Sequence, residues 1–308
     1  MNAPDLTTRL GETVLPDPLL TASGCGGTGC ELDPFLDMST LAGFVTRTIT
    51  LDASAGRPLP RVVTTPSGLL SAMGGQNPGL QGFLAAELPW LARRRVRTVV
   101  SIAGRTLGEY GELTRRVGQA PGVHGLEVNM ATANSEARDR DFDTDPRQVA
   151  KVVNVVRRDA PRGVAVWAKL SPHSRLVDLA RAAADEGADA LVLVHGFPGM
   201  LGGGVGRLSG PAVHPLALEC VWRVHEALSR MPIVGVGGIR SAADVWGMLL
   251  AGASAVQLGS VLLSDPAAPA RILTDLRALP ALQGYSRLAD VVGAAHAPVA
   301  HAPEEERA

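Results

Sequence analysis

The sequence predicts one α/β domain folded as a (β/α)8 TIM barrel, and three observations support this. Eight short apolar runs between residues 18 and 258 have the composition of strands buried on both faces. Amphipathic segments with helical spacing lie between most of these runs, and no linker divides the chain. The alternative is an open doubly wound sheet, which usually has fewer strands.

The strand candidates are almost continuous hydrophobic runs that each end in small or polar residues. Helices that cover both faces of a parallel sheet require apolar side chains on both faces of each strand. The candidates are Pro18–Ser23, Gly43–Thr48, Arg97–Ala103, His124–Asn129, Val164–Leu170, Ala188–Val194, Pro232–Val236 and Ala253–Leu258.

The helix candidates are rich in Ala, Leu and Arg at helical spacing. Asp145-Pro146 and Ser241–Asp244 are typical helix starts, with a capping side chain followed by Pro or an acidic residue in the first turn. The expected helices are Leu107–Val117, Pro146–Arg158, Leu176–Glu186, Ala217–Leu228, Ala242–Ala251 and Pro266–Ala278.

Two segments do not fit the repeat. Leu51–Leu91 holds many Pro and Gly and no clear helix until its end, so we expect a lid or an insertion that covers one face of the barrel. Residues 296–308 are rich in Pro and Glu and are expected to be a disordered tail. The predicted domain therefore spans residues 1–295.

Composition excludes several classes of function. A net charge of -1 and the absence of a basic stripe argue against a nucleic-acid partner. No apolar run reaches membrane-span length, and the N-terminus lacks a signal-peptide pattern, so we expect a cytoplasmic protein. The 3 cysteines form no C-x-x-C pair, which argues against a metal site or a disulfide framework.

Glycine-rich turns follow the last two predicted strands. Gly235-Val-Gly-Gly-Ile239 follows the seventh strand, and Leu258-Gly-Ser260 follows the eighth. In (β/α)8 barrels these two loops often bind a phosphate through backbone N–H groups, and a Cβ there would block close approach. Leu208–Ala212, after the sixth strand, either closes the same site or caps the next helix. The pattern predicts a phosphate site formed by these loops.

Polar residues also stand at the ends of other predicted strands, where barrel enzymes place their functional groups. Lys169 is the least ordinary, because burying an ammonium without a partner is costly. Arg47 ends the second strand and His195 ends the sixth, and both are candidate ligand contacts. The alternative roles are an ion pair with a carboxylate for Arg47 and a hydrogen-bonded rim position for His195. In Leu126–Asn134, an apolar strand runs into Asn129, Thr132 and Asn134, which is either a ligand-orienting loop or an ordinary polar strand end.

These motifs resemble the catalytic subunit of class 1 dihydroorotate dehydrogenases, and are more similar to the type with an iron–sulfur/FAD partner subunit. The resemblance covers about Leu15 to Gly293. The segments that carry it are Thr21–Cys25, Pro58–Arg61, Ser67–Gly79, Leu88–Leu91, Lys169–Pro172, Leu208–Ala212, Gly235–Gly238 and Ala251–Ala255.

The resemblance implies an FMN-dependent oxidoreductase of pyrimidine biosynthesis. FMN would lie on the barrel and accept a hydride from a CH–CH bond of dihydroorotate, while a side chain in the loop after the fourth strand removes a proton. By position, the cofactor contacts would be Ala22, Ser23, Gly24, Thr48, Ser101, Asn129, Lys169, Val194, Ser209, Gly210, Gly237, Gly238, Gly259 and Ser260.

The substrate half of the site departs from the family pattern. Thr132 stands where the family has a Cys or Ser base, and a β-branched alcohol is stiffer and a poor base without a proton acceptor. Arg47 replaces a Lys, whereas Ser71 and His195 replace Asn residues. With Asn129 and Asn134, these residues form the predicted substrate contacts, and the following loop, Ser135–Asp141, is charged rather than glycine-rich.

Three functions remain open from the sequence. The first is oxidation of dihydroorotate, and the second is oxidation of a different heterocycle or enoyl compound by a paralogue with the same FMN barrel. The third is a non-catalytic flavin-binding subunit. A homodimer and an iron–sulfur/FAD electron-transfer partner are implied by the resemblance alone.

Overall fold

Eight parallel strands form a barrel in the computed structural model, which describes residues 5–131, 142–201, 204–279 and 285–297. Each predicted strand is present, so the prediction of a (β/α)8 barrel is confirmed. Around the barrel the strands are β3 (Leu19–Thr21), β14 (Ala255–Leu258), β13 (Ile233–Val236), β10 (Ala190–Leu193), β9 (Ala165–Leu170), β8 (Val123–Asn129), β7 (Thr98–Ile102) and β4 (Phe44–Val45).

The barrel is closed between its first and second strands. Leu20 and Gly43 form a parallel bridge, and the backbone N–H of Thr21 donates to the carbonyl of Gly43 at 3.1 Å. The hydroxyl of Thr21 accepts from the N–H of Val45 at 3.0 Å. Closure leaves neither β3 nor β4 as an open sheet edge.

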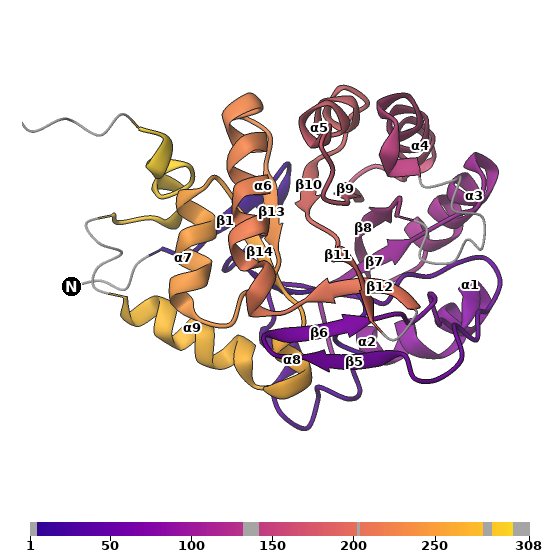
Figure 1. Ribbon diagram of the computed structural model, residues 1–308. Helices are drawn as coiled ribbons and strands as arrows, with labels where there is room; N and C mark the ends of the chain where they lie inside the picture. Colours follow the sequence, from indigo (N-terminus) through magenta and orange to yellow (C-terminus); the bar gives the residue numbers. More distant parts are fainter. Residues whose placement is uncertain (1–4, 132–141, 202–203, 280–284, 298–308) are drawn as a thin grey trace, which may run out of the picture.

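Helices surround the barrel, as Figure 1 shows. They are α3 (Leu107–Gly118), α4 (Pro146–Asp159), α5 (Leu176–Asp185), α6 (His214–Ala227), α7 (Ala242–Leu250) and α9 (Ala268–Ala278), with the shorter α1 (Gly79–Gly82), α2 (Leu88–Arg93) and α8 (Val261–Ser264). All six predicted helices are present, although α6 begins three residues before the predicted start. The short helix α8 was not predicted.

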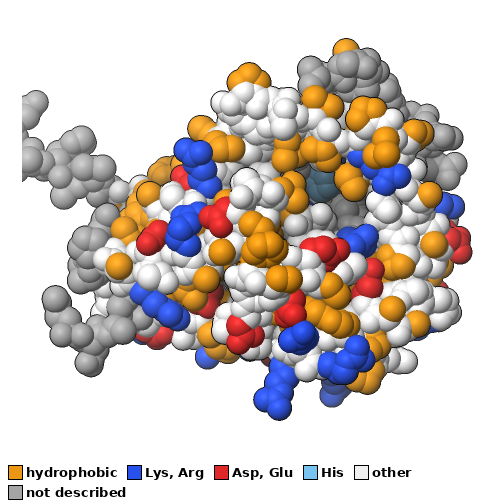
Figure 2. All heavy atoms as spheres, turned by 90° about the horizontal axis from the view of Figure 1, so that it is seen from below, with side chains coloured by type: hydrophobic (Ala, Val, Ile, Leu, Met, Phe, Trp, Pro, Cys, Tyr) orange, Lys and Arg blue, Asp and Glu red, His pale blue; other side chains and the backbone are white. Residues whose placement is uncertain are grey.

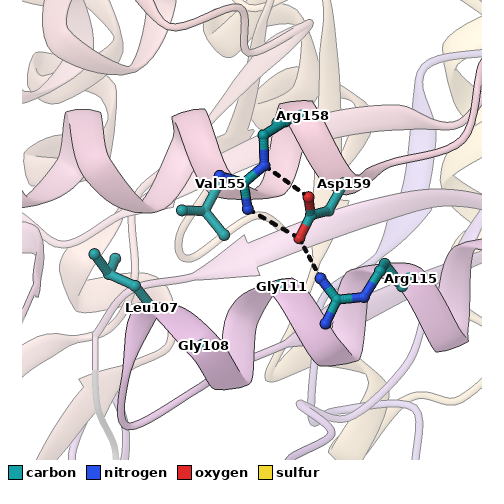
Figure 3. Close-up of a pocket in the computed structure, with 7 residues that line it drawn as sticks. All are labelled: Leu107, Gly108, Gly111, Arg115, Val155, Arg158 and Asp159. Atoms are coloured by element: carbon teal, nitrogen blue, oxygen red, sulfur yellow. Dashed lines mark hydrogen bonds and ion pairs between the residues drawn. The ribbon is translucent and has the colours of Figure 1, made fainter.

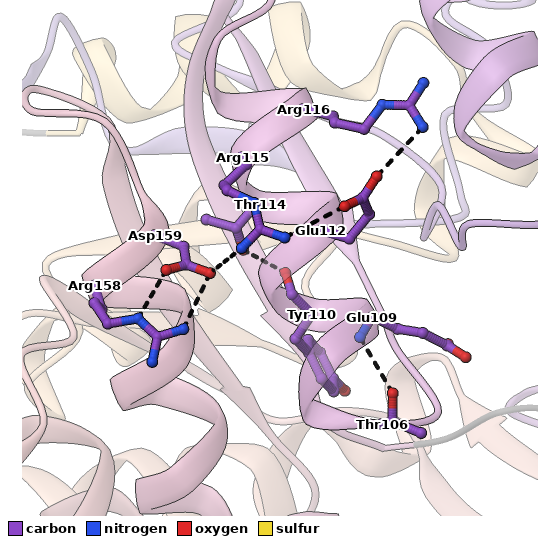
Figure 4. Close-up of polar contacts among 9 residues, drawn as sticks. All are labelled: Thr106, Glu109, Tyr110, Glu112, Thr114, Arg115, Arg116, Arg158 and Asp159. Carbon is purple, nitrogen blue, oxygen red and sulfur yellow. Dashed lines mark hydrogen bonds and ion pairs between the residues drawn. The ribbon is translucent and has the colours of Figure 1, made fainter.

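The helix starts follow their sequence signals. Asp145 accepts from the N–H of Arg147, and Ser241 and Asp244 form a reciprocal capping box, as predicted. Thr106 caps α3 by accepting from the N–H of Glu109 at 3.2 Å, which Figure 4 shows.

Two hydrophobic clusters hold the fold together. The larger lies between the strands and the helices, and includes Val153, Leu179 and Leu249. The smaller includes Trp167, Val192 and Ala255 from the barrel strands, together with Leu10 and Leu15. These two leucines come from the hairpin of β1 (Thr8–Leu10) and β2 (Thr13–Leu15) and are completely buried, so the hairpin packs onto the strand residues of this cluster.

A second, antiparallel sheet was not predicted. It joins β5 (Val62–Thr65) and β6 (Gly68–Ser71) of the long insertion to β11 (Phe197–Leu201) and β12 (Gly204–Ser209), in the order β11-β12-β6-β5. The sequence signal was weak because Phe197–Ser209 is rich in Gly, which has low strand propensity. Figure 1 shows this sheet alongside the barrel. Its β12 ends beside the segments that follow β10 and β13, so the insertion covers the carboxyl end of the barrel.

The remaining structure is short turns and the chain end. Within the described ranges, no helix is long and apolar enough to cross a lipid bilayer. His296 ends the last turn (Ala294–His296) and stacks on Trp222 with 3.6 Å between ring centroids. Residues 298–308 lie outside the described residues, so the boundary at 295 stays a prediction.

Candidate functional site

Free backbone donors gather after β13 and β14, where the sequence predicts a phosphate site. These strands are parallel neighbours, with Val236 in register with Gln257. Among the described residues, no protein acceptor takes the backbone N–H groups of Gly238, Gly259 or Ser260. Unpaired amides on two adjacent loops form a cradle suited to an anion.

The glycines of the β13 loop were predicted to leave room for a phosphate, but in the structure they leave room for neighbouring parts of the protein. Gly237 and Gly238 have φ of 139° and 68°, which disfavour any side chain. A Cβ on Gly238 would lie 2.7 Å from the carbonyl oxygen of Gly210, and one on Gly237 would lie 2.6 Å from the Cβ of Ala217. The constraint therefore comes from packing within the protein. Gly259, by contrast, has room for a Cβ.

Ser209 and Gly210 lie against the same cradle. Gly210 follows β12 and starts the turn Pro211–Val213, which leads into α6. The ring Nδ1 of His214, the first residue of α6, lies 3.0 Å from the carbonyl oxygen of Gly237. The Leu208–Ala212 segment thus leads into a helix and also borders the predicted phosphate loops.

The turn after β3 contacts the end of β14. The N–H of Ala22 donates to the carbonyl of Leu258 at 2.8 Å, and a Cβ on Gly259 would lie 3.6 Å from the Cβ of Ala22. Gly24 has φ of 84° and open space around it. Ala22, Ser23 and Gly24 therefore lie beside the loop that holds Gly259 and Ser260.

A chain of polar side chains crosses the carboxyl ends of β3, β4, β7 and β8. The hydroxyl of Thr48 lies 3.4 Å from that of Ser23 and 3.0 Å from that of Ser101. Asn129 donates its Nδ2 to Thr48 at 3.0 Å, while its buried Oδ1 has no protein partner. A buried acceptor without a partner is costly, so this oxygen is available to a ligand N–H.

Lys169 is buried and paired with a carboxylate inside the barrel. Its Nζ lies 3.1 Å from Oε1 of Glu127, whose side chain is fully buried. The other carboxylate oxygen accepts from Nε2 of Gln257 at 2.7 Å. Neither Glu127 nor Gln257 was predicted from the sequence, although a Glu within an apolar strand is a detectable signal of a paired buried charge.

Arg47 lies near a carboxylate, as its alternative interpretation predicted. Its Nε is 4.0 Å from Oε2 of Glu87, which precedes α2. This nitrogen is buried and makes no hydrogen bond. Burial raises the pKa of Glu87, while the charge of Arg47 opposes that rise and that of Glu31 adds to it.

His195 directly follows Val194 at the end of β10 and is a neutral imidazole at neutral pH. Burial lowers its pKa to about 3, and the charges of Lys169 and Arg207 contribute to this shift. Its Nδ1 is buried without a hydrogen-bond partner. Arg207, which the sequence analysis missed, donates to the carbonyl of Gly196 at 3.4 Å.

Ser71 reaches this region through the second sheet. It ends β6 and pairs with Arg207 of β12, whose carbonyl accepts from the Ser71 hydroxyl at 3.5 Å. The structure thus brings Ser71, Arg207 and His195 to one side of the barrel opening, from segments far apart in the sequence.

The predicted base lies outside the described residues. Thr132 and Asn134 belong to the stretch 132–141, and their roles stay predictions. The residues immediately before this stretch, Met130 and Ala131, are buried. The described part of this segment therefore ends in packed side chains.

The surface of the molecule is hollowed on the face seen in Figure 2, where a histidine and basic side chains lie in the hollow and acidic side chains lie at its rim. A separate cavity lies on the outer surface, between two helices. This cavity, of about 200 Å³ and shown in Figure 3, lies between α3 and α4 and is lined by Arg115, Arg158 and Asp159, which pair with one another. It contains none of the predicted site residues.

In the described part of the chain, no group of three or more His, Cys, Asp or Glu side chains is arranged to hold a metal ion. Cys25, Cys30 and Cys220 are free thiols, and burial raises the pKa of Cys25 and Cys220.

Comparisons with known proteins point to one family. Residues 5–279 match the family model described as dihydroorotate dehydrogenase. A protein of Desulforudis audaxviator is 42% identical over 293 residues, covering 92% of this chain and 94% of its own. A protein of Geotalea daltonii is 39% identical over 305 residues, covering 96% and 99%. Both are named dihydroorotate dehydrogenase B (NAD(+)), catalytic subunit.

The neutral state of His195 predicts how stability depends on pH. Between its folded-state pKa of about 3 and the ordinary value of 6.5, the unfolded chain binds a proton that the folded chain does not. The contribution of His195 to the free energy of unfolding is therefore fully present above about pH 6.5 and is lost as the pH drops toward 3. We expect His195 to account for about 2 kcal/mol of the free energy of unfolding lost between pH 7 and pH 5.

Urea unfolding at the two pH values measures this loss. His195→Asn should reduce the loss by about 2 kcal/mol, whereas His124→Gln, at an exposed histidine, serves as the control. An equal loss in His195→Asn and the wild type would contradict the assignment.

Proposed function

The chain belongs to the dihydroorotate dehydrogenase family of flavin-dependent oxidoreductases that act on CH–CH bonds, and on this basis we propose that its flavin is FMN and its substrate dihydroorotate. The observation that carries the proposal is the pair of loops after β13 and β14, whose amides are free to bind one phosphate. The protein would then serve pyrimidine biosynthesis.

The cofactor half of the site fits an FMN molecule. The phosphate would bind Gly237, Gly238, Gly259 and Ser260, with Ser209 and Gly210 at its side. The isoalloxazine ring, with its N–H donor and carbonyl acceptors, would lie at the barrel opening. Its lining would come from Ala22, Ser23, Gly24, Thr48, Ser101, Asn129, Lys169 and Val194. The unpaired Oδ1 of Asn129 supplies an acceptor for a ring N–H.

The chemistry divides between cofactor and protein. When bound, the flavin would supply a hydride acceptor for one carbon of the CH–CH bond, and a protein base would take the proton from the neighbouring carbon. We assign the base to Thr132, with Asn129 and Asn134 holding the substrate. A threonine hydroxyl can take this proton only if it passes its own proton onward, so a water or a second side chain must complete the path.

The remaining substrate contacts would come from Arg47, Ser71 and His195. The guanidinium of Arg47 can bind a substrate carboxylate in a bidentate manner. His195, held neutral, offers one ring N–H donor and one ring nitrogen acceptor to the polar groups of a heterocycle.

A second candidate is oxidation of a different CH–CH compound by the same FMN barrel. The observation that favours it is the position of Arg47, whose Nε lies 4.0 Å from Glu87. The nearby carboxylate offsets part of the charge that would attract the carboxylate of dihydroorotate.

The assembly and the compartment are also proposals. The relatives are named catalytic subunits, which supports an electron-transfer partner. We propose that this partner is an iron–sulfur/FAD subunit joined to a homodimer of this chain. The three free cysteines fit the reducing cytoplasm.

The proposed phosphate cradle predicts that a single Gly→Ala substitution in it lowers the flavin content of the protein. The wild type should release about one FMN per chain on denaturation, and Gly238→Ala should lower FMN affinity about tenfold or more. The added Cβ would displace the Gly210 segment from the cradle. Flavin fluorescence on release measures the content.

Gly163→Ala is a matched control, because Gly163 also has a positive φ, of 82°, but has no neighbour within 4 Å of an added Cβ. It should keep the wild-type FMN content. A wild type that binds no FMN on reconstitution would refute the proposed cofactor.

Anaerobic flavin reduction distinguishes the two candidate substrates. Dihydroorotate at millimolar concentration should bleach the flavin absorbance of the wild type. The combined variant Arg47→Lys, Ser71→Asn, Thr132→Cys and His195→Asn should bleach about tenfold faster or more, because it restores the family's substrate contacts and base. If neither protein is bleached while dithionite still reduces the flavin, dihydroorotate is not the substrate.

A further inference from the structure

Glu127 is a carboxylate buried within the barrel strands. It lies on β8 between the fully buried Leu126 and Val128, and its own exposure is 0%. Because side chains alternate along a strand, Glu127 shares a face with Asn129, one layer further from the carboxyl end. A carboxylate in such a place is costly to bury unless it is paired and hydrogen-bonded.

The carboxylate is held from two sides of the barrel. Its Oε1 lies 3.1 Å from Nζ of Lys169, on the adjacent strand β9. Its Oε2 accepts from Nε2 of Gln257 at 2.7 Å, on β14, which is separated from β8 by three strands in the barrel order. Gln257 thus reaches Glu127 across the barrel and fixes its position independently of Lys169.

The ammonium of Lys169 lies just above this carboxylate, toward the barrel opening. Lys169 is in register with Asn129, whose Oδ1 is buried without a hydrogen-bond partner. Burial raises the pKa of Cys25 and lowers that of His195, and the charge of Lys169 opposes the first shift and adds to the second. Both residues follow the ends of other strands. The charge of Lys169 therefore acts across the opening, and Glu127 offsets it from below.

We propose that Glu127 is a positioning residue that holds the Lys169 ammonium under the flavin and limits the positive charge that the flavin experiences. Gln257 fixes the carboxylate in this role. The proposal rests on the proposed binding of FMN at the barrel opening.

This role sets the balance between oxidised and reduced flavin. Reduction adds electron density to the ring, and a nearby positive charge stabilises that form more than the oxidised form. Removing the negative charge of Glu127 leaves Lys169 uncompensated, so the flavin becomes easier to reduce. The effect is strong because the pair is shielded from water.

The test is the midpoint potential of bound FMN, measured spectroscopically during anaerobic reduction of the holoenzyme. E127Q should favour reduced flavin about tenfold or more, which corresponds to a positive shift of about 30 mV for a two-electron couple. The double variant E127Q/Q257E returns one carboxylate to the same buried layer from β14 and should restore the potential to within about threefold of the wild-type equilibrium. E112Q removes a half-buried glutamate on α3, far from the barrel opening, and should leave the potential unchanged.

A wild-type potential in E127Q that retains FMN would overturn the proposal. A double variant that shifts as far as E127Q would also overturn it, because that result assigns the shift to altered packing rather than to charge. If E127Q does not fold, E127M takes its place: it also removes the charge with a side chain of similar length, and a wild-type potential there overturns the proposal. A wild type without FMN refutes the proposed function itself, and is seen before any potential is measured.

Discussion

The ion pair between Lys169 and Glu127 is the interaction on which the arrangement of the site depends. Removing one partner of such a buried pair typically costs about 3–5 kcal/mol, so each residue requires the other, and Gln257 satisfies the second carboxylate oxygen. Apolar side chains of the barrel strands, such as Trp167 and Val192, form the smaller hydrophobic cluster. Nearer the opening, Asn129, Thr48 and Ser101 form a polar layer with an acceptor left over for a ligand. The change from an apolar to a polar lining is what makes the carboxyl end a binding surface.

Close backbone packing shapes the other side of the opening. Gly237 and Gly238 adopt positive φ so that Gly210 and α6 can approach them, and the amide of Gly238 then has no protein acceptor. The segment that contains Gly210 also belongs to the second sheet. Its preceding strand, β12, ends at Ser209 and pairs with β6 of the long insertion. The segment that borders the phosphate loops therefore also anchors the cover of the barrel. This shared use explains why the motifs Ser67–Gly79 and Leu208–Ala212, far apart in the sequence, belong to one region.

The barrel was predictable because its strands are buried on both faces and are therefore almost continuously apolar, as in Ala188–Val194. The helices between them have clear periodicity and capping residues, such as Ser241 with Asp244. The second sheet was not predictable, since its Gly-rich strands have weak propensity and pair only with distant segments. Side-chain partners were missed for the same reason: Gln257 meets Glu127 across 130 positions of sequence, and Glu87 approaches Arg47 from the insertion. Arg47, Lys169 and His195 could be identified as functional candidates, but their charge partners depend on the three-dimensional fold.

A crystal structure of the FMN-loaded protein would show whether the loops after β13 and β14 bind the phosphate of a flavin mononucleotide, as we propose. We expect phosphate oxygens within hydrogen-bonding distance of the amides of Gly238, Gly259 and Ser260, with the ring beside Asn129 and Lys169. A phosphate bound elsewhere, with these amides facing only solvent, would contradict the proposal.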